Sequence, residues 1–366
     1  MPIESLFITS FRNHKSKKIE FSEGLTVIWG ENGSGKTSIL EAVHLLSYGK
    51  SFKTHQQKNL IKDREDFAIA KGVFFGRYDK DVIAAQMNRK TRNTFKLNGK
   101  PVLSRKDLIG RNSVVVLSPE EQPITKGSPL ERRQFFDKMF SVSNQDYINT
   151  LQKYNQVLKQ RNAALLSVRE GFMKEGDMSS WDDSFSSVAE SLWLMRKKHL
   201  TLFKEIYYSF IDRYDKNLKI EVLYKKETPL KEEIQKDLLK TKKTDIFKGR
   251  TSIGPHKDDI KILWKKKDIR NFGSQGEHKL ALVLLKISEM AFIKKKTSVF
   301  PILLLDDLFS KLDLERSKKI VSLLGDLKSE KGKPVQTIIT TTDMLNIEKS
   351  GLLENQKNIK TYRLQR

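Results

Sequence analysis

Gly30-Glu31-Asn32-Gly33-Ser34-Gly35-Lys36-Thr37 has the form G-x-x-x-x-G-K-[ST], which is that of the phosphate-binding P-loop. Residues 25–29 in front of it are β-branched and apolar and predict a strand. Residues 38–46 behind it carry apolar side chains at helical spacing. Strand, glycine loop and helix are the context that this motif requires, so the sequence predicts a phosphate site at the start of a helix.

Each part of the motif has an expected task. The glycines allow a backbone turn that a Cβ atom would block, so that successive N–H groups converge on phosphate oxygens. Lys36 is expected to reach the β- and γ-phosphates, and the Thr37 hydroxyl is expected to ligate Mg²⁺. An ordinary glycine-rich turn before a helix is the alternative, and the flanking strand and helix disfavour it.

A second motif lies near the other end of the chain, at Pro301-Ile302-Leu303-Leu304-Leu305-Asp306-Asp307. Four consecutive aliphatic residues predict a buried parallel strand, and ligands of α/β sheets bind at the carboxyl ends of such strands. After a P-loop, this pattern is a Walker B strand in which Asp306 holds Mg²⁺ and Asp307 polarises the attacking water. The alternative is a strand that ends in an acidic turn.

Ser274-Gln275-Gly276-Glu277 opens an apolar helix and allows two interpretations. Ser-x-x-Glu is a capping box, which by itself only begins a helix. A helix N-terminus with a serine and a glycine also docks a phosphate, here on a nucleotide held by another chain. Gly254-Pro255-His256-Lys257-Asp258-Asp259, a turn with two carboxylates, is a plain loop on composition alone.

The middle of the chain, from about residue 129 to residue 214, predicts helices only. Residues 171–180 would connect two of them, which then fold back as an antiparallel arm. The second helix carries apolar residues spaced alternately by four and three, a heptad seam made of Trp181, Phe185, Val188, Leu192, Met195, His199, Leu202 and Ile206. Residues 67–102 instead predict an antiparallel meander with a hairpin turn at Asn98-Gly99.

The composition favours a polyanionic partner. The 366 residues include 69 lysines and arginines against 45 aspartates and glutamates, a formal charge of +24. Solubility is the simpler explanation, but an excess of this size favours nucleic acid. The absence of cysteine excludes disulfides and thiolate metal sites, and the six histidines show no zinc spacing. No apolar run approaches the roughly 20 residues of a membrane span and no signal peptide is evident, so a cytoplasmic protein is expected.

Walker A near one end and Walker B near the other, with Ser-Gln-Gly-Glu before Walker B, is the layout of ABC-type ATPases. In finer detail the chain resembles the RecF family over nearly its whole length. The motifs that carry this resemblance are Phe11-Arg12-Asn13, Ser118-Pro119-Glu120-Glu121, Lys126-Gly127-Ser128-Pro129 with Arg132-Arg133, residues 254–259, residues 274–277 and residues 303–313. The departures are small: His14 stands where an aromatic residue is common, Lys257 where arginine is usual and Glu277 where glutamine is frequent.

The resemblance implies an α/β fold, with an ABC-type P-loop ATPase head that contains a mixed sheet and an antiparallel meander. An α-helical arm domain, shorter than the coiled coil of the related SMC ATPases, would be inserted into this head. The expected division is residues 1–128 for the N-terminal part of the head, 129–245 for the arm and 246–366 for the C-terminal part of the head.

The resemblance also implies roles for single residues. Asp307 and Lys36 would be catalytic, Thr37 and Asp306 would bind Mg²⁺, and residues 310–313 would form the D-loop. ATP would be held by the P-loop, by Arg12 and by the signature of a partner chain. The residues concerned are Gly30, Glu31, Asn32, Gly33, Ser34, Gly35, Lys36, Thr37, Ser38, Arg12, Ser274, Gln275 and Gly276.

The function that the resemblance implies is recombinational DNA repair and replication restart after DNA damage. Such proteins bind double- and single-stranded DNA at gap junctions, form a homodimer on ATP and hydrolyse ATP slowly as a DNA-dependent clamp switch. They act with RecR and RecO, and so promote RecA loading.

Two alternatives remain. An ABC transporter ATP-binding subunit should lack the arm and the strong positive charge and should carry Leu-Ser-Gly-Gly-Gln, which is absent. A P-loop small-molecule kinase would need an acceptor site near the P-loop, and the sequence shows none.

Overall fold

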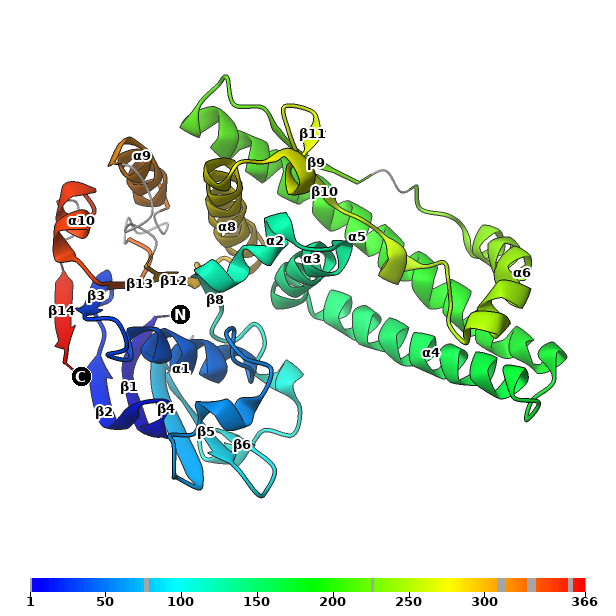
Figure 1. Ribbon diagram of the computed structural model, residues 1–366, viewed down its shortest axis with the longest axis horizontal. Coiled ribbons are helices and arrows are strands. Elements are labelled where there is room, and N and C mark those ends of the chain that lie inside the picture. The colour runs from blue at the N-terminus through cyan, green and yellow to red at the C-terminus, as the bar shows by residue number, and fades with distance from the viewer. Residues whose placement is uncertain are drawn as a thin grey trace. The chain divides into compact units, whose positions relative to one another are not determined.

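The computed structural model describes residues 2–75, 79–224, 227–307, 314–327, 334–354 and 358–365 (Figure 1). The chain forms two compact units. The first consists of Met1–Gln122, Ser209–Leu218 and Lys279–Arg366, and the second of Pro123–Tyr208 and Lys219–His278. The division at residues 128/129 and 245/246 stays a prediction. In the part of the chain that is described, no helix has both the length and the apolarity needed to cross a bilayer.

A parallel five-stranded sheet in the first unit carries the P-loop. Its strand order is β14 (Ile359–Leu364), β3 (Leu25–Gly30), β13 (Thr337–Thr341), β12 (Ile302–Asp306) and β8 (Val114–Leu117), and every neighbouring pair is parallel. β3 and β12 are the strands predicted for the two nucleotide motifs. All of β8, β12 and β13 is buried, as expected for parallel strands that are covered on both faces.

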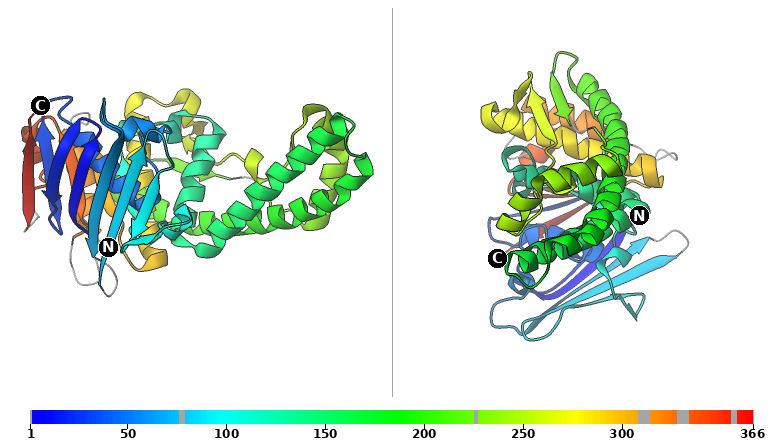
Figure 2. Two further views of the ribbon diagram at one scale, coloured as in Figure 1. Left: turned by 90° about the horizontal axis from the view of Figure 1, so that it is seen from below. Right: turned by 90° about the vertical axis from the view of Figure 1, so that its right-hand side faces the viewer.

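The second sheet of this unit is antiparallel, and its strands lie side by side in Figure 2, left. Its order is β2 (His14–Glu20), β1 (Ile3–Phe11), β4 (Phe67–Phe75), β5 (Lys80–Asn88), β6 (Thr94–Leu97) and β7 (Lys100–Pro101). The turn between the last two strands has φ of 50° at Asn98 and 81° at Gly99. Positive φ at both central residues is the geometry of a type I′ hairpin turn. The α/β class and the predicted meander are therefore confirmed.

Helix α1 (Lys36–Tyr48) packs between these two sheets and is buried along nearly its whole length. Its polar side chains therefore need partners inside the protein. Glu41 receives two hydrogen bonds of 2.7 Å from the Arg12 guanidinium. The Tyr48 hydroxyl donates to the Val114 carbonyl at 2.7 Å, and His44 Nδ1 lies 2.8 Å from the Lys50 carbonyl. Arg12 is thus tied to the helix that follows the P-loop.

The second unit is mainly helical, and α4 (Gln145–Arg169) and α5 (Ser179–Tyr214) run alongside one another in Figure 1. Tyr147 contacts His199, Tyr154 contacts Phe185, and Arg161 pairs with Asp182. As the residue number on α4 increases from 147 to 161, the number of its partner on α5 decreases from 199 to 182. The two helices are therefore antiparallel, as predicted. The other helices of this unit are α2 (Pro123–Lys126), α3 (Pro129–Ser143), α6 (Lys231–Lys248) and α7 (Ile269–Phe272), and its strands are β9 (Ile220–Leu223), β10 (Lys261–Trp264) and β11 (Lys267–Asp268). Helix α8 (Gln275–Thr297) begins in this unit, and from Lys279 onward its residues belong to the first unit. In the first unit, α9 (Leu314–Gly325) and α10 (Met344–Lys349) complete the helices described.

The buried face of α5 follows the predicted heptad seam at first and then departs from it. Phe185, Val188, Leu192 and His199 are buried, whereas Met195, Leu202 and Ile206 are only half-buried. Instead, Arg196, Leu200, Phe203 and Tyr207 are buried, each one position further along the helix. A straight helix with 3.6 residues per turn drifts about 20° per heptad from a 3.5-residue repeat, which explains the shift.

A buried polar network surrounds Asp258 in the second unit. The Asp258 Oδ2 atom accepts hydrogen bonds from Trp193 Nε1 at 2.7 Å, from Arg196 Nη1 at 2.8 Å and from the Tyr224 hydroxyl at 2.7 Å. Arg196 also donates to both carboxylate oxygens of Asp137 at 3.1 Å. The expected plain loop at residues 254–259 is therefore part of the core of this unit.

Two motifs that are far apart in the sequence meet in this region. Arg132 donates to both carboxylate oxygens of Asp259, at 2.9 and 3.1 Å, and Arg133 Nη1 donates to the Asp258 carbonyl at 2.5 Å. The neighbouring His256 ring accepts from the Tyr154 hydroxyl at Nδ1 and donates from Nε2 to the Thr251 carbonyl. Burial lowers the pKa of His256 to about 4, so the ring is neutral at neutral pH.

Replacement of Asp258 by alanine should destabilise the second unit by about 3–5 kcal/mol, because it leaves the buried Trp193 and Arg196 and the half-buried Tyr224 without their shared acceptor. Urea unfolding followed by the helical circular dichroism signal measures the change. Asp237→Ala on α6 is the matched control, because that carboxylate is exposed and its ion pair with Lys240 lies on the surface. We expect the control to change stability by no more than about 0.5 kcal/mol; equal effects of both variants would contradict the structural role of Asp258.

Candidate nucleotide-binding site

The P-loop connects β3 to α1 through backbone conformations that favour glycine. Gly30, Gly33 and Gly35 have φ of 151°, 83° and 92°. A Cβ atom on Gly30 would lie 2.2 Å from the Leu364 carbonyl oxygen of the neighbouring strand β14. A Cβ atom on Gly35 would lie 2.3 Å from His14 Nε2 and 2.5 Å from Asn13 Oδ1. The glycines are therefore required both for the turn and for close packing.

Asn13, in the turn after β1, and His14, the first residue of β2, hold two carbonyls of the P-loop. Asn13 Nδ2 donates to the Gly33 carbonyl and His14 Nε2 donates to the Gly35 carbonyl, each at 3.0 Å. Burial lowers the pKa of His14, and the hydrogen bond to Gly35 works in the opposite direction. Within the loop the Ser34 N–H donates to the Glu31 carbonyl at 3.3 Å. Successive N–H groups of a loop of this kind converge on phosphate oxygens.

Inside the loop, Lys36 is buried and its Nζ atom donates to the carbonyls of Gly30 and Glu31 at 2.8 Å each. Burial lowers the pKa of Lys36, while the charges of Asp307 and Asp306 raise it. The Ser34 hydroxyl is also buried and has no hydrogen-bond partner among the described residues. An ammonium group and an unsatisfied hydroxyl beside a glycine loop fit the oxygens of a nucleotide phosphate.

The structure brings Thr37 and Asp306 together although they lie 269 positions apart in the sequence. Thr37 Oγ1 is 2.9 and 3.1 Å from the two carboxylate oxygens of Asp306. Thr340, from the neighbouring strand β13, donates to the same carboxylate at 2.5 Å. Burial raises the pKa of Asp306, and these two hydrogen bonds lower it. A hydroxyl and a carboxylate are the oxygen ligands that Mg²⁺ prefers, so this pair fits the predicted metal site.

Asp307 follows directly at the end of β12 and has an unusual backbone conformation. Its φ is 51°, and its N–H donates to the Thr340 carbonyl at 3.0 Å. Non-glycine residues in this region cost free energy and often occur at functional sites. The position next to Asp306 fits the predicted role as base, and that role stays a prediction.

Glu120, from the motif at residues 118–121, is a further acidic residue at this site. It follows β8, which pairs with β12 in parallel, so the ends of both strands lie at one edge of the sheet. Its charge contributes to the raised pKa of Asp306. Its Oε2 atom is buried and unpaired within the described residues. Glu120 and Thr340 lie at this site because β8 and β13 flank β12. This strand order could not be predicted from the sequence.

Arg12 has a different environment from the other predicted site residues. Its Nε and Nη2 atoms donate to Glu41, and its Nη1 atom donates to the Asn59 carbonyl at 2.7 Å. Glu41 also accepts a hydrogen bond from Ser51. The guanidinium group thus neutralises a buried carboxylate, and its predicted contact with ATP stays a prediction.

The signature residues lie in the second unit. Ser274 caps α8: Glu277 accepts from the Ser274 N–H at 2.8 Å, and Ser274 Oγ accepts from the Glu277 N–H at 3.3 Å. The capping box is therefore confirmed. Ser274 and Gln275 are exposed and Gly276 is half-buried, so the start of this helix is accessible to a partner. The predicted D-loop, residues 310–313, lies outside the described residues.

Residues 2–364 match the model of the RecF/RecN/SMC N terminal domain family. A DNA replication and repair protein RecF from Thermoanaerobacter sp. is 34% identical over 93% of this chain and 94% of its own length. The chain belongs to the RecF family. Its RecF relative from Clostridium acetobutylicum is 33% identical over 98% of this chain and 97% of the relative.

A solved structure of the recombination mediator protein RecF with ATP, in the RecFOR pathway, agrees with this assignment. It has 30% sequence identity and a TM-score of 0.84, and the match covers 93% of this chain and 92% of that one. An Smc head domain from Pyrococcus furiosus has a TM-score of 0.57 at 18% identity. At that identity the likeness shows the fold alone, an SMC-like ATPase head, which RecF proteins share.

Replacement of Gly35 by alanine should lower the affinity for ATP more than about tenfold, which corresponds to about 1.4 kcal/mol. The new methyl group would displace His14 and Asn13 and distort the loop. Gly99→Ala is the matched control, because Gly99 also has a positive φ of 81° but nothing lies within 4 Å of the position of its Cβ. Titration with a fluorescent ATP analogue should show normal affinity for Gly99→Ala. Equal losses in both variants would mean that general strain, not the P-loop, is responsible.

Proposed function

We propose that this protein is an ATP-dependent DNA-binding protein of recombinational repair and replication restart. The observation that supports it best is the contact of Thr37 with Asp306, because it joins the P-loop to the Walker B strand in one site. The relatives named DNA replication and repair protein RecF support the biological role. In this proposal the protein is a weak DNA-dependent ATPase.

Each part of the site has a task in binding ATP. The loop N–H groups and Lys36 hold the phosphates, and Thr37 and Asp306 hold Mg²⁺. Mg²⁺, when bound, supplies positive charge that neutralises the phosphate oxygens. Asp307 orients the attacking water and accepts its proton. Thr340 keeps the Asp306 carboxylate in place, since it donates to the oxygen that also faces Thr37.

ATP is proposed to close a homodimer. Ser274, Gln275 and Gly276 of one chain would complete the phosphate site of the other, where the positive end of α8 stabilises negative charge. The exposed start of this helix supports the idea, because Ser274 and Gln275 are accessible. Slow hydrolysis would then open the dimer and reset the clamp on DNA.

DNA is the proposed binding partner, in double-stranded, single-stranded and gapped forms. The charge of +24 supports a polyanionic partner. The structure of the related RecF protein in the RecFOR pathway supports partnership with RecR and RecO, and through them RecA loading at single-strand gaps. The transporter subunit and the small-molecule kinase are the alternatives, and stimulation of ATP hydrolysis by DNA distinguishes the proposed protein from both.

Two substitutions should separate ATP binding from hydrolysis. Lys36→Met removes a phosphate contact, so the variant should stay monomeric with ATP and should lose DNA-stimulated hydrolysis. Asp307→Asn keeps the shape of the side chain but removes the base, so it should bind ATP, dimerise and stay on DNA. Analytical ultracentrifugation with ATP and DNA checks both variants. If the two behave identically, assembly and hydrolysis are not divided in this way.

A third substitution tests whether the site is shared between chains. Ser274→Arg should block dimer closure while the monomer still binds ATP. Mixed with Lys36→Met, it should restore one composite site, because an intact P-loop then faces an intact signature. Crosslinking of the mixed dimer with ATP is the measurement, and ATPase activity is a second one. Normal dimerisation by Ser274→Arg alone would reduce Ser274 to a helix cap.

A further inference from the structure

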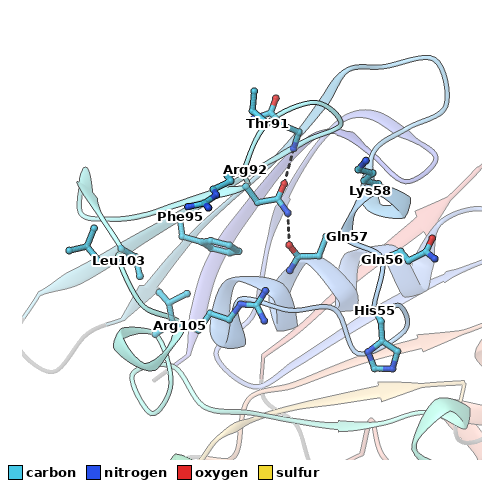
Figure 3. A pocket seen from close by; sticks show the side chains of 13 residues that line it. His55, Gln56, Gln57, Lys58, Thr91, Arg92, Phe95, Leu103 and Arg105 are labelled. Atoms are coloured by element: carbon cyan, nitrogen blue, oxygen red, sulfur yellow. Dashed lines mark hydrogen bonds between the residues drawn. The ribbon is translucent and has the colours of Figure 1, made fainter. Parts of the chain in front are cut away.

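A pocket of about 830 Å³ opens in the first unit, beside the antiparallel sheet (Figure 3). Three segments line it: residues 55–58 with the start of the short helix η1 (Gln57–Leu60), residues 88–95 with the loop between β5 and β6, and residues 102–108. None of them belongs to the P-loop or to Walker B. The nucleotide-binding site therefore does not account for this pocket.

The pocket is positively charged. Lys58, Arg92 and Arg105 line it together with His55, and among the described residues no aspartate or glutamate does so. In the described part of the chain, no carboxylate lies within ion-pair distance of these three cations. All three side chains are exposed. Three cations around one pocket attract a ligand with several negative charges.

An aromatic ring lies among these cations. Phe95 on β6 is half-buried, and Arg92 and Arg105 lie on either side of it in Figure 3. Four amide side chains, Gln56, Gln57, Asn88 and Asn93, add hydrogen-bonding groups to the lining. Two of these are already ordered, because Asn93 donates to Gln57 and also accepts from the Asn88 N–H at 2.9 Å. An aromatic face beside guanidinium groups and amides suits a base with its phosphate.

We propose that this pocket binds an unpaired nucleotide of a DNA strand, with the base stacked on Phe95 and the flanking phosphates held by Arg92, Arg105 and Lys58. The inference rests on the proposed DNA-binding function and adds the place on the chain that would hold an unpaired nucleotide next to a duplex. The loop between β5 and β6 would then lie where the base-paired duplex ends and the single strand begins.

The size and lining of the pocket select an unpaired nucleotide over a duplex. A volume of about 830 Å³ lies in the range of pockets that enclose one small molecule. Bases within a duplex are stacked on each other and present only their edges in the grooves. The flat face that Phe95 would stack on is exposed only in an unpaired base. The three cations come from three different segments of the chain that line the pocket.

Fluorescence anisotropy tests the proposal with the full-length protein and ATP. The probes are a blunt duplex and the same duplex with a short single-stranded tail. The wild-type protein should prefer the tailed probe, and Phe95→Ala should reduce its affinity for that probe about tenfold with little change for the blunt one. Phe95→Trp should retain the preference, because the indole still stacks. Phe7→Ala is the matched control, since Phe7 is an exposed aromatic residue on β1 of the same sheet.

The charged residues are tested by the dependence on salt. Arg92→Gln and Arg105→Gln should each reduce the slope of log K against log salt for the tailed probe by about 0.7, the value for one phosphate of a single strand. Lys18→Gln, at the opposite edge of the sheet, should leave that preference unchanged. Circular dichroism and thermal unfolding confirm that each variant is folded.

The possible results separate the inference from the function on which it rests. Equal affinity of the wild-type protein for both probes, or an unchanged preference in Phe95→Ala, overturns the pocket assignment and leaves DNA binding intact. Competition by free dTMP that is stronger than competition by the same concentration of nucleotides in a single strand would assign the pocket to free nucleotides instead. Absence of any DNA binding overturns the proposed function and the inference together.

Discussion

The burial of α1 between two sheets is the constraint on which the first unit depends. A helix in this position has no solvent-facing side, so each polar group on it needs a partner from a surrounding element. Arg12, directly after β1, neutralises Glu41, and the Val114 carbonyl of β8 accepts from Tyr48. These contacts fix the helix relative to both sheets. Because the P-loop leads directly into that helix, and its last two residues, Lys36 and Thr37, form the helix start, the end of the loop is fixed with it.

Elements with a local burial pattern could be predicted from the sequence. The four aliphatic residues of β12, the alternating strands of the meander and the apolar stripes of α4 and α5 all carry such a pattern. Arg196 could not be predicted, because an arginine in a helix is normally exposed. It is buried only because Asp137 and Asp258, from two distant segments, meet around it. A pairing of this kind leaves no periodic signal in the sequence.

The candidate site also contains some residues that could be predicted from the sequence and others that could not. The form of the P-loop, and the strand that ends in Asp306 and Asp307, follow from short motifs whose spacing reflects their chemistry. Thr340 and Glu120 lie beside Asp306 because β13 and β8 flank β12. Strand order is a property of the whole sheet, so no local pattern marks these two residues. The pocket around Phe95 combines three separate segments and was beyond prediction for that reason.

The order of strands in the parallel sheet has a consequence for synthesis of the chain. β3 lies between β14 and β13, so both of its neighbours come from residues beyond 336. At about 5–20 residues per second, a ribosome needs about 15–60 s to make the roughly 300 residues that separate them. Throughout that time the strand before the P-loop has two unpaired edges, a known risk for aggregation. All residues of the second unit are made earlier, because it ends at His278. The nascent chain therefore contains the complete second unit before the last strands of its nucleotide-binding sheet have been synthesised.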